Sequence, residues 1–337
     1  MADFSYMSSA PSSEWTDFEK TWKPPSPPAT ASVTQIRDLA NAGTAKLFAD
    51  VLGRPEAGLD IADYNIPTTD GVTIPVRLYS PRGTSGSPLP LYISFHGGGY
   101  YMGSLETEDP HCRQVVLNTG AAVLNVNYRH TPDWTFPAPV DDAWAAFQWA
   151  RGSAEQHNLD PQRIYVGGVS AGGTLAITTA LRALGEGTTA VKGLFLATPV
   201  TVHPDHFPSE LVKNGRSSLQ ENANAPFINA AKLRNFMTLY QPDPADPECS
   251  PLLLSTESFS GLCPTWIHVA GLDPLRDEGL LFEERLRNAG VKTTLYTYPG
   301  IPHAFMSLPK LPSAALYRER LYRDLKTAIA SSESSHI

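Results

Sequence analysis

The chain has 337 residues, of which 42% are hydrophobic and 18% charged, a composition that excludes a wholly disordered chain and a coiled coil. The 26 basic and 34 acidic residues give a net charge of −8 without a long basic run, which argues against binding to nucleic acid or to an anionic membrane. Cys112, Cys249 and Cys263 lack the spacing of a metal site or a disulfide framework, so we expect free thiols.

The N-terminal third opens with a helical pattern and then a hairpin. The Pro-rich run 23–28 predicts a stiff, extended spacer. Apolar residues from Val33 to Val51 recur at steps of three and four, which predicts an amphipathic helix that ends near Gly53. Two short strands are expected at 61–67 and 72–79, joined by a turn at 69–71.

From residue 88 onward, apolar strands alternate with helices. Continuous apolar runs predict strands at 89–95, 121–128, 163–167, 191–198, 265–270 and 293–298. The stretches between them predict helices at 106–119, 137–151, 171–185, 277–289 and 311–330. This order predicts a mostly parallel sheet with helices on both faces. Residues 200–262 interrupt the alternation and predict an insertion with one helix, at 230–240.

The segment Gly168-Val169-Ser170-Ala171-Gly172 follows a predicted strand directly and opens a predicted helix. A sharp strand-to-helix turn leaves room only for glycine beside a strained residue, and it presents the serine hydroxyl at a helix N-terminus. Ser170 is therefore a candidate nucleophile.

The segment His96-Gly97-Gly98-Gly99 comes directly after another predicted strand. Consecutive glycines leave backbone N–H groups free to approach a ligand closely, as an oxyanion hole requires. A glycine loop of this kind opposite a nucleophile-elbow serine is the lipase and esterase arrangement of the α/β-hydrolase fold.

A serine nucleophile needs a base and an orienting acid, which in this fold follow it in the order acid, then histidine. Asp273 comes directly after the strand expected at 265–270, and His303 lies in the loop after the last strand. Asp277 and Glu278 compete for the role of acid, although their positions are typical of acids at a helix N-terminus. The remaining histidines are less suited by their positions in a strand, in the insertion, before the elbow or in the tail: His268, His203, His206, His111, His130, His157 and His336.

Across about residues 60–330, these motifs resemble the hormone-sensitive-lipase family of α/β-hydrolases, the bacterial type IV esterase group. The Tyr128-Arg129 pair, the segment 139–143 and the segment 273–278 belong to the same resemblance. The resemblance implies Ser170 as nucleophile, His303 as base and Asp273 as its partner. It also implies that the backbone N–H groups of Gly97, Gly98 and Ala171 form the oxyanion hole.

The family also carries a mainly helical cap, which the resemblance places at 1–55 and 200–250, over a core at 56–199 and 251–337. The chain departs from the family where Val169 replaces the usual aspartate, where Asn127 precedes Tyr128-Arg129, and where Ala304 follows the base. None of these changes removes a catalytic group. Val169 puts the pH optimum or the substrate range in doubt.

These observations predict a serine carboxylesterase that acts through an acyl-enzyme without a cofactor or a metal. The family resemblance implies short- to medium-chain acyl esters as its substrates. The insertion resembles that of fungal members, which suggests deacetylation or release of a natural-product intermediate in secondary metabolism. Aromatic side chains near the motifs are candidates for the substrate pocket, with ordinary packing as the alternative: Tyr100, Tyr101, Trp134, Phe207 and Phe305.

Two other functions stay open at this point: an amide, thioester or arylformamide hydrolase on the same machinery, and a receptor-like member that binds a ligand without turnover. The retained His303 argues against the receptor. No stretch approaches the ~20 apolar residues of a membrane span, and the N-terminus lacks the features of a signal peptide. We therefore expect a cytoplasmic protein with a small-molecule ester as its partner. The sequence does not indicate an oligomeric state.

Overall fold

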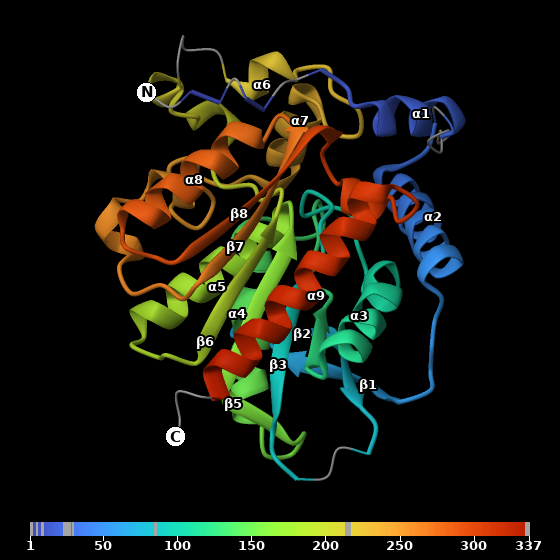
Figure 1. The fold of residues 1–337 in the computed structure, drawn as a ribbon, viewed down its shortest axis with the longest axis vertical. Coiled ribbons are helices and arrows are strands. Elements are labelled where there is room, and N and C mark those ends of the chain that lie inside the picture. The colour runs from blue at the N-terminus through green and yellow to red at the C-terminus, as the bar shows by residue number, and fades with distance from the viewer. Residues whose placement is uncertain are drawn as a thin grey trace.

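The computed structural model of the protein describes residues 3–4, 6–7, 10–22, 28, 30–83, 86–212 and 217–333. A sheet of eight strands in the order β1-β2-β4-β3-β5-β6-β7-β8 forms its centre (Figure 1). The strands are β1 (Leu59–Pro67), β2 (Thr73–Pro81), β3 (Leu89–Phe95), β4 (Ala122–Val126), β5 (Leu159–Val169), β6 (Val191–Ala197), β7 (Thr265–Leu272) and β8 (Thr293–Pro302).

The sheet is parallel from β4 through β8, whereas β1 and β2 join one edge as an antiparallel pair. Successive residues of a central strand enter different cores, as Ile93 and Tyr92 of β3 do. Since both faces of the central strands are buried, their sequences read as continuous apolar runs. The prediction of a mostly parallel sheet covered on both faces is confirmed.

The sheet is covered by two groups of helices. Cys112 and Val115 of α3 (Leu105–Thr119) and Leu321 of α9 (Pro312–Glu333) share one core with Tyr92. The helices α4 (Ala138–Gly152), α5 (Ala171–Gly185) and α8 (Arg276–Asn288) supply the other core. Figure 1 shows α3 and α9 in front of the sheet.

The cap segments, as we call residues 1–55 and 200–250, contain four α-helices among the described residues: α1 (Ser13–Thr21), α2 (Val33–Leu52), α6 (Ser218–Glu221) and α7 (Ala230–Tyr240). Figure 1 shows α1, α6 and α7 gathered at the end of the molecule towards which β6 and β7 point. The sequence reading missed α1, which begins where Ser12 Oγ accepts a hydrogen bond from the Trp15 N–H at 3.2 Å. Of the predicted spacer, only Pro28 lies within the described residues.

The structure also describes the three cysteines and the apolar character of the helices. All three cysteines carry free thiols, with Cys112 and Cys249 buried and Cys263 partly buried, as predicted. Within the described ranges, none of the helices is long and apolar enough to cross a membrane.

Candidate active site

Ser170 stands at the sharp turn between β5 and α5. Its backbone has φ 54° and ψ −119°, a conformation that is rare for any residue but glycine. The Ser170 N–H donates to the carbonyl of Ala197 at 2.9 Å, which ties the turn to the end of β6. The turn therefore holds the serine in the strained geometry that the sequence motif predicts.

The glycines around Ser170 are required by close backbone contacts. A Cβ atom on Gly168 would collide with the Gly172 backbone, and one on Gly172 would collide with the carbonyl oxygen of Phe95. A Cβ atom on Gly173 would lie only 2.8 Å from Pro199. Each glycine thus allows one close approach, and side chains at these positions would push the serine out of place.

The three predicted side chains form one hydrogen-bonded chain. His303, which follows β8, lies with Nδ1 2.7 Å from Asp273 Oδ2 and with Nε2 3.0 Å from Ser170 Oγ. Asp273 Oδ1 accepts a second bond from the Leu275 N–H at 2.8 Å. Because the carboxylate only accepts, Nδ1 carries the ring proton and Nε2 is left to accept the proton of the serine hydroxyl.

This group of side chains is almost sealed from solvent. Ser170 is 3% exposed, Asp273 1% and His303 0%. Phe236 of α7 covers the glycine loop so closely that a Cβ atom on Gly99 would lie 2.5 Å from its ring. A low-dielectric setting strengthens hydrogen bonds.

The glycine loop after β3 packs directly against the serine turn. A Cβ atom on Gly97 would lie 3.1 Å from the carbonyl oxygen of Val169. Gly98 has φ 126°, and its carbonyl accepts from the Met102 N–H at 2.9 Å. Val169, at the position where the family usually has aspartate, is therefore a packing contact between the two loops.

His96 contacts the glycine loop through its side chain. Its Nδ1–H donates to the carbonyl of Gly97 at 2.9 Å, and its ring stacks on Tyr128 at 4.2 Å. Burial lowers the pKa of His96 to about 4, so the ring is neutral at pH 7. The Tyr128 hydroxyl donates to the carbonyl of His96 at 2.9 Å, which gives a role to one member of the Tyr128-Arg129 pair.

The competing acids have other partners. Asp277 Oδ2 accepts from the Ser218 N–H at 2.7 Å, and Oδ1 accepts from the Arg276 guanidinium at 2.7 Å. Glu278 Oε1 accepts from the Thr201 N–H at 2.6 Å, and burial raises the pKa of this carboxyl well above its usual range. Both acids lie in the first turn of α8, as the sequence predicts, but they bind backbone of the insertion.

The competing histidines lie elsewhere. His268 is a buried core residue, as predicted, with Nδ1 2.9 Å from the Tyr298 hydroxyl. His203 Nδ1 accepts from the Asp205 N–H within the insertion. His130 stacks on His96 with ring centroids 5.2 Å apart. His336 falls outside the described residues.

The five aromatic candidates for the substrate pocket differ in burial and in their neighbours. Tyr100 stacks on Tyr240 with ring centroids 3.8 Å apart, and Phe305 lies 4.4 Å from Tyr298. Tyr100 and Phe305 are 1% and 0% exposed, so neither contacts a substrate unless its surroundings move.

The other three rings differ in their surroundings. The Tyr101 hydroxyl donates to the carbonyl of Val33 in the cap. Trp134 is 41% exposed and lies under the Arg129 guanidinium at 4.6 Å. Phe207 is partly buried against the core to which α4, α5 and α8 contribute. A pocket lined by these five rings stays a prediction.

The surroundings of the site are held by a pair from the segments that carry the family resemblance and by two asparagines that the sequence analysis missed. Arg129 forms a buried pair with Asp142 at 2.6 Å, which fastens the loop after β4 to α4. Asn41 exchanges two hydrogen bonds with the backbone of Gly103, at 2.8 and 2.9 Å. Asn222 donates to the carbonyl of Asp273 at 3.0 Å. Neither asparagine stands in a local motif, so no sequence signal distinguishes it.

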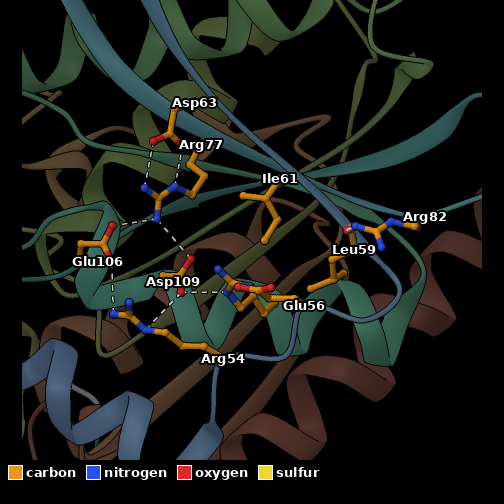
Figure 2. A pocket seen from close by; sticks show the side chains of 10 residues that line it. Arg54, Glu56, Leu59, Ile61, Asp63, Arg77, Arg82, Glu106 and Asp109 are labelled. Carbon is orange, nitrogen blue, oxygen red and sulfur yellow. Dashed lines mark hydrogen bonds and ion pairs between the residues drawn. The ribbon is translucent and has the colours of Figure 1, made fainter.

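A separate hollow of about 490 Å³ lies between the end of α2, the strands β1 and β2, and α3 (Figure 2). Figure 2 shows several of its charged side chains paired with each other, as in the bonds from Arg77 to Asp63 at 2.6 Å and to Glu106 at 2.9 Å. Arg113 likewise binds the fully buried Asp109 at 2.9 Å. Four arginines and four acids line the hollow, so it carries no net charge to attract an ion.

Comparison of the sequence with models of known protein families identifies the family of this chain. Residues 92–307 match the model of an α/β-hydrolase fold family. The chain belongs to this family, in its hormone-sensitive-lipase-like branch, as the motifs predicted.

Individual relatives support the same assignment. The versiconal hemiacetal acetate esterase of Dothistroma septosporum is 32% identical over 77% of this chain and 80% of its own length. The ethyl acetate hydrolase of Pseudomonas putida is 36% identical over 77% of this chain and 79% of its own. The crystal structure of vibralactone cyclase superposes with a TM-score of 0.88 at 29% identity, covering 96% of each chain.

Proposed function

We propose that this carboxylic ester hydrolase acts through a covalent acyl-enzyme on Ser170, with His303 as general base and Asp273 as its orienting partner. The observation that carries the proposal is the continuous pair of hydrogen bonds, 3.0 and 2.7 Å long, that joins the three side chains. Asp273 fixes the tautomer in which His303 Nε2 accepts, and the imidazole is thereby ready to take the serine proton.

The chemistry follows from this order. Ser170 Oγ attacks the ester carbonyl carbon while His303 takes the hydroxyl proton, and the C–O bond then breaks as His303 protonates the leaving alkoxide. Water repeats the sequence on the acyl-enzyme and releases the acid. We assign the stabilisation of the tetrahedral oxyanion to the backbone N–H groups of Gly97, Gly98 and Ala171, each worth about 10²–10³ in kcat.

For the substrate we propose an ester with a short acyl group, and an acetate first of all. Two similar enzymes carry acetate esters in their names, one of them an acetate of a larger alcohol. We further propose that residues 1–55 and 200–250 act as a cap that selects the alcohol, because the triad is 0–3% exposed and Phe236 of α7 packs on the neighbouring glycine loop. Removal of an acetyl group from a natural-product intermediate fits this scheme, as does a cytoplasmic location.

The decisive experiment compares wild type with Ser170→Ala on p-nitrophenyl acetate, butyrate and octanoate. We expect the rate to fall with chain length in the wild type and to fall by about 10⁴-fold or more in the variant. Full activity of Ser170→Ala would overturn the mechanism. Matched amide, thioester and arylformamide substrates in the same assay separate those bonds from the ester.

Ring closure in place of hydrolysis is a second candidate, which two observations favour. The fold superposes closely on vibralactone cyclase, and the triad is 0–3% exposed, which restricts the entry of water. In ring closure a hydroxyl of the acyl group itself attacks the acyl-enzyme carbonyl and frees Ser170 as a lactone leaves, whereas in hydrolysis water does so and an acid leaves. Mass spectrometry separates the two outcomes, because the acid is heavier than the lactone by one water while the released alcohol is the same.

A further inference from the structure

The loop that carries Asp273 leaves the sheet at an irregular point. The ladder between β7 and β8 shifts its register between Ala270 and Leu272, so regular strand pairing stops just before the acid. The loop has two bonds of its own, from the Leu275 N–H to Asp273 Oδ1 at 2.8 Å and from the Arg276 N–H to the Asp273 carbonyl at 3.1 Å, and it has further partners outside it. Residues 271–277, the acid loop from here on, find these partners in the insertion.

Asn222 provides the contact closest to the acid. Its side-chain amide donates to the carbonyl of Gly271 at 3.2 Å and to the carbonyl of Asp273 at 3.0 Å. Asn222 is only 5% exposed, so water does not replace these bonds freely. One amide group thus holds the backbone on both sides of the bend from which the Asp273 side chain projects.

Ser218 adds three bonds further along the same loop. Its N–H donates to Asp277 Oδ2 at 2.7 Å, and its hydroxyl donates to the carbonyl of Pro274 at 2.8 Å. The Asp277 N–H donates in turn to the Ser218 hydroxyl at 3.0 Å. The segment 218–222 therefore follows the acid loop along most of its length.

We infer that Asn222 is a positioning residue for Asp273, through which the insertion keeps the catalytic acid aligned with His303. The inference rests on the proposed function, because it assigns Asn222 a task only if Asp273 serves His303. A displacement of about 1 Å in a catalytic group costs about 100-fold in rate. Asn222 has no contact with the substrate in this scheme, and its loss acts on kcat.

The test uses the full-length protein with two variants of Asn222. Asn222→Ala removes the amide, and Asn222→Leu removes it while keeping the shape of the side chain. On p-nitrophenyl acetate we expect kcat to fall by about 10- to 100-fold in both variants, with KM within about threefold of wild type. The control is Asn229→Ala in the same insertion, because the Asn229 amide only caps α7 through the Lys232 N–H at 2.9 Å.

A second readout separates positioning from general damage to the fold. The proton on His303 Nδ1 sits in a charge-assisted bond of 2.7 Å, for which we expect a far-downfield proton resonance in the wild type and in Asn229→Ala. This resonance is expected to shift upfield or to vanish in both Asn222 variants. Equal losses of kcat in Asn222→Ala and Asn229→Ala would overturn the inference, as would Asn222 variants with kcat within twofold of wild type. If Ser170→Ala kept full activity, the proposed function itself would fail.

Discussion

The serine turn and the acid loop are held in place by different parts of the chain. Around Ser170 the restraints come from the strand and helix that flank it and from glycines two and three residues away, as the collision of a Gly168 Cβ with Gly172 shows. The acid loop is held by Asn222 and Ser218, about fifty residues before it in the chain. The contacts of the serine turn stay within the sheet and its adjoining segments, as between Gly172 and Phe95, whereas those of Asn222 and Ser218 exist only once the insertion has folded over the sheet.

The largest effect is expected at the acid itself. Asp273→Asn keeps the shape of the side chain but removes the charge that fixes the His303 tautomer, so kcat is expected to fall by about 10⁴-fold. Asp277→Asn is the comparison, because Asp277 binds Ser218 and Arg276. We expect it to keep kcat within about tenfold of wild type. Steady-state kinetics of both variants on one ester provide the measurement. A larger loss of kcat in Asp277→Asn than in Asp273→Asn would assign the role of the catalytic acid to Asp277.

A restraint on the serine turn is tested next with Gly172→Ala. The new methyl group would collide with the carbonyl oxygen of Phe95, so the serine turn or the end of β3 has to shift. We expect kcat/KM to fall by about 100-fold or more. Gly185→Ala is the matched control at the far end of the same helix, where a Cβ atom meets nothing within 4 Å. Equal activity of the two variants would show that the turn tolerates a side chain.

A long-range restraint on the glycine loop is tested with Asn41→Ala. The variant loses both hydrogen bonds between α2 and the Gly103 backbone, while the loop keeps its own internal bonds. We expect kcat/KM to fall by about tenfold, less than for Gly172→Ala. Lys46→Ala on the same helix removes only an exposed pair with Asp50, and it is expected to leave activity unchanged. An Asn41→Ala variant with wild-type kinetics would show that the bonds from α2 to Gly103 do not position the glycine loop.

The smallest effect concerns stability in acid and leaves the site untouched. Burial lowers the pKa of His268 to about 3, so the folded protein keeps this ring neutral where the unfolded chain protonates it. Stability therefore falls as pH drops below about 6.5, by about 2 kcal/mol between pH 6.5 and 5 for this one group. Melting curves at pH 7.5 and 5 are expected to show a smaller drop in Tm for His268→Phe than for wild type. An equal drop would mean that His268 is protonated in the fold.

The sequence predicted the sheet and the three triad positions because each depends on short segments. Continuous apolar runs mark the parallel strands, and Gly168, Ser170 and Gly172 carry the geometry of their turn within five residues. The placement of Asp273 and His303 followed from the order of the strands, since the carboxyl ends of parallel strands meet at one edge of the sheet.

The contacts of the cap were beyond the sequence because they join distant segments through single polar side chains. Asn222 and Asn41 look like any other asparagine until the chain has folded. The helix α1 was missed because its nine residues are too few for a clear apolar period. The pocket candidates were chosen by nearness to the motifs and stay a prediction, because nearness in sequence does not tell which way a ring such as Phe305 points.

The central claim is that His303 and Asp273 activate Ser170 as a nucleophile. Labelling with a fluorophosphonate tests it directly, because an unactivated serine does not react at a comparable rate. We predict one adduct per chain in the wild type, located on Ser170 by peptide mass spectrometry, and no adduct in His303→Ala within the same time. A wild-type protein that stays unlabelled, or that is labelled at another serine, would contradict the account.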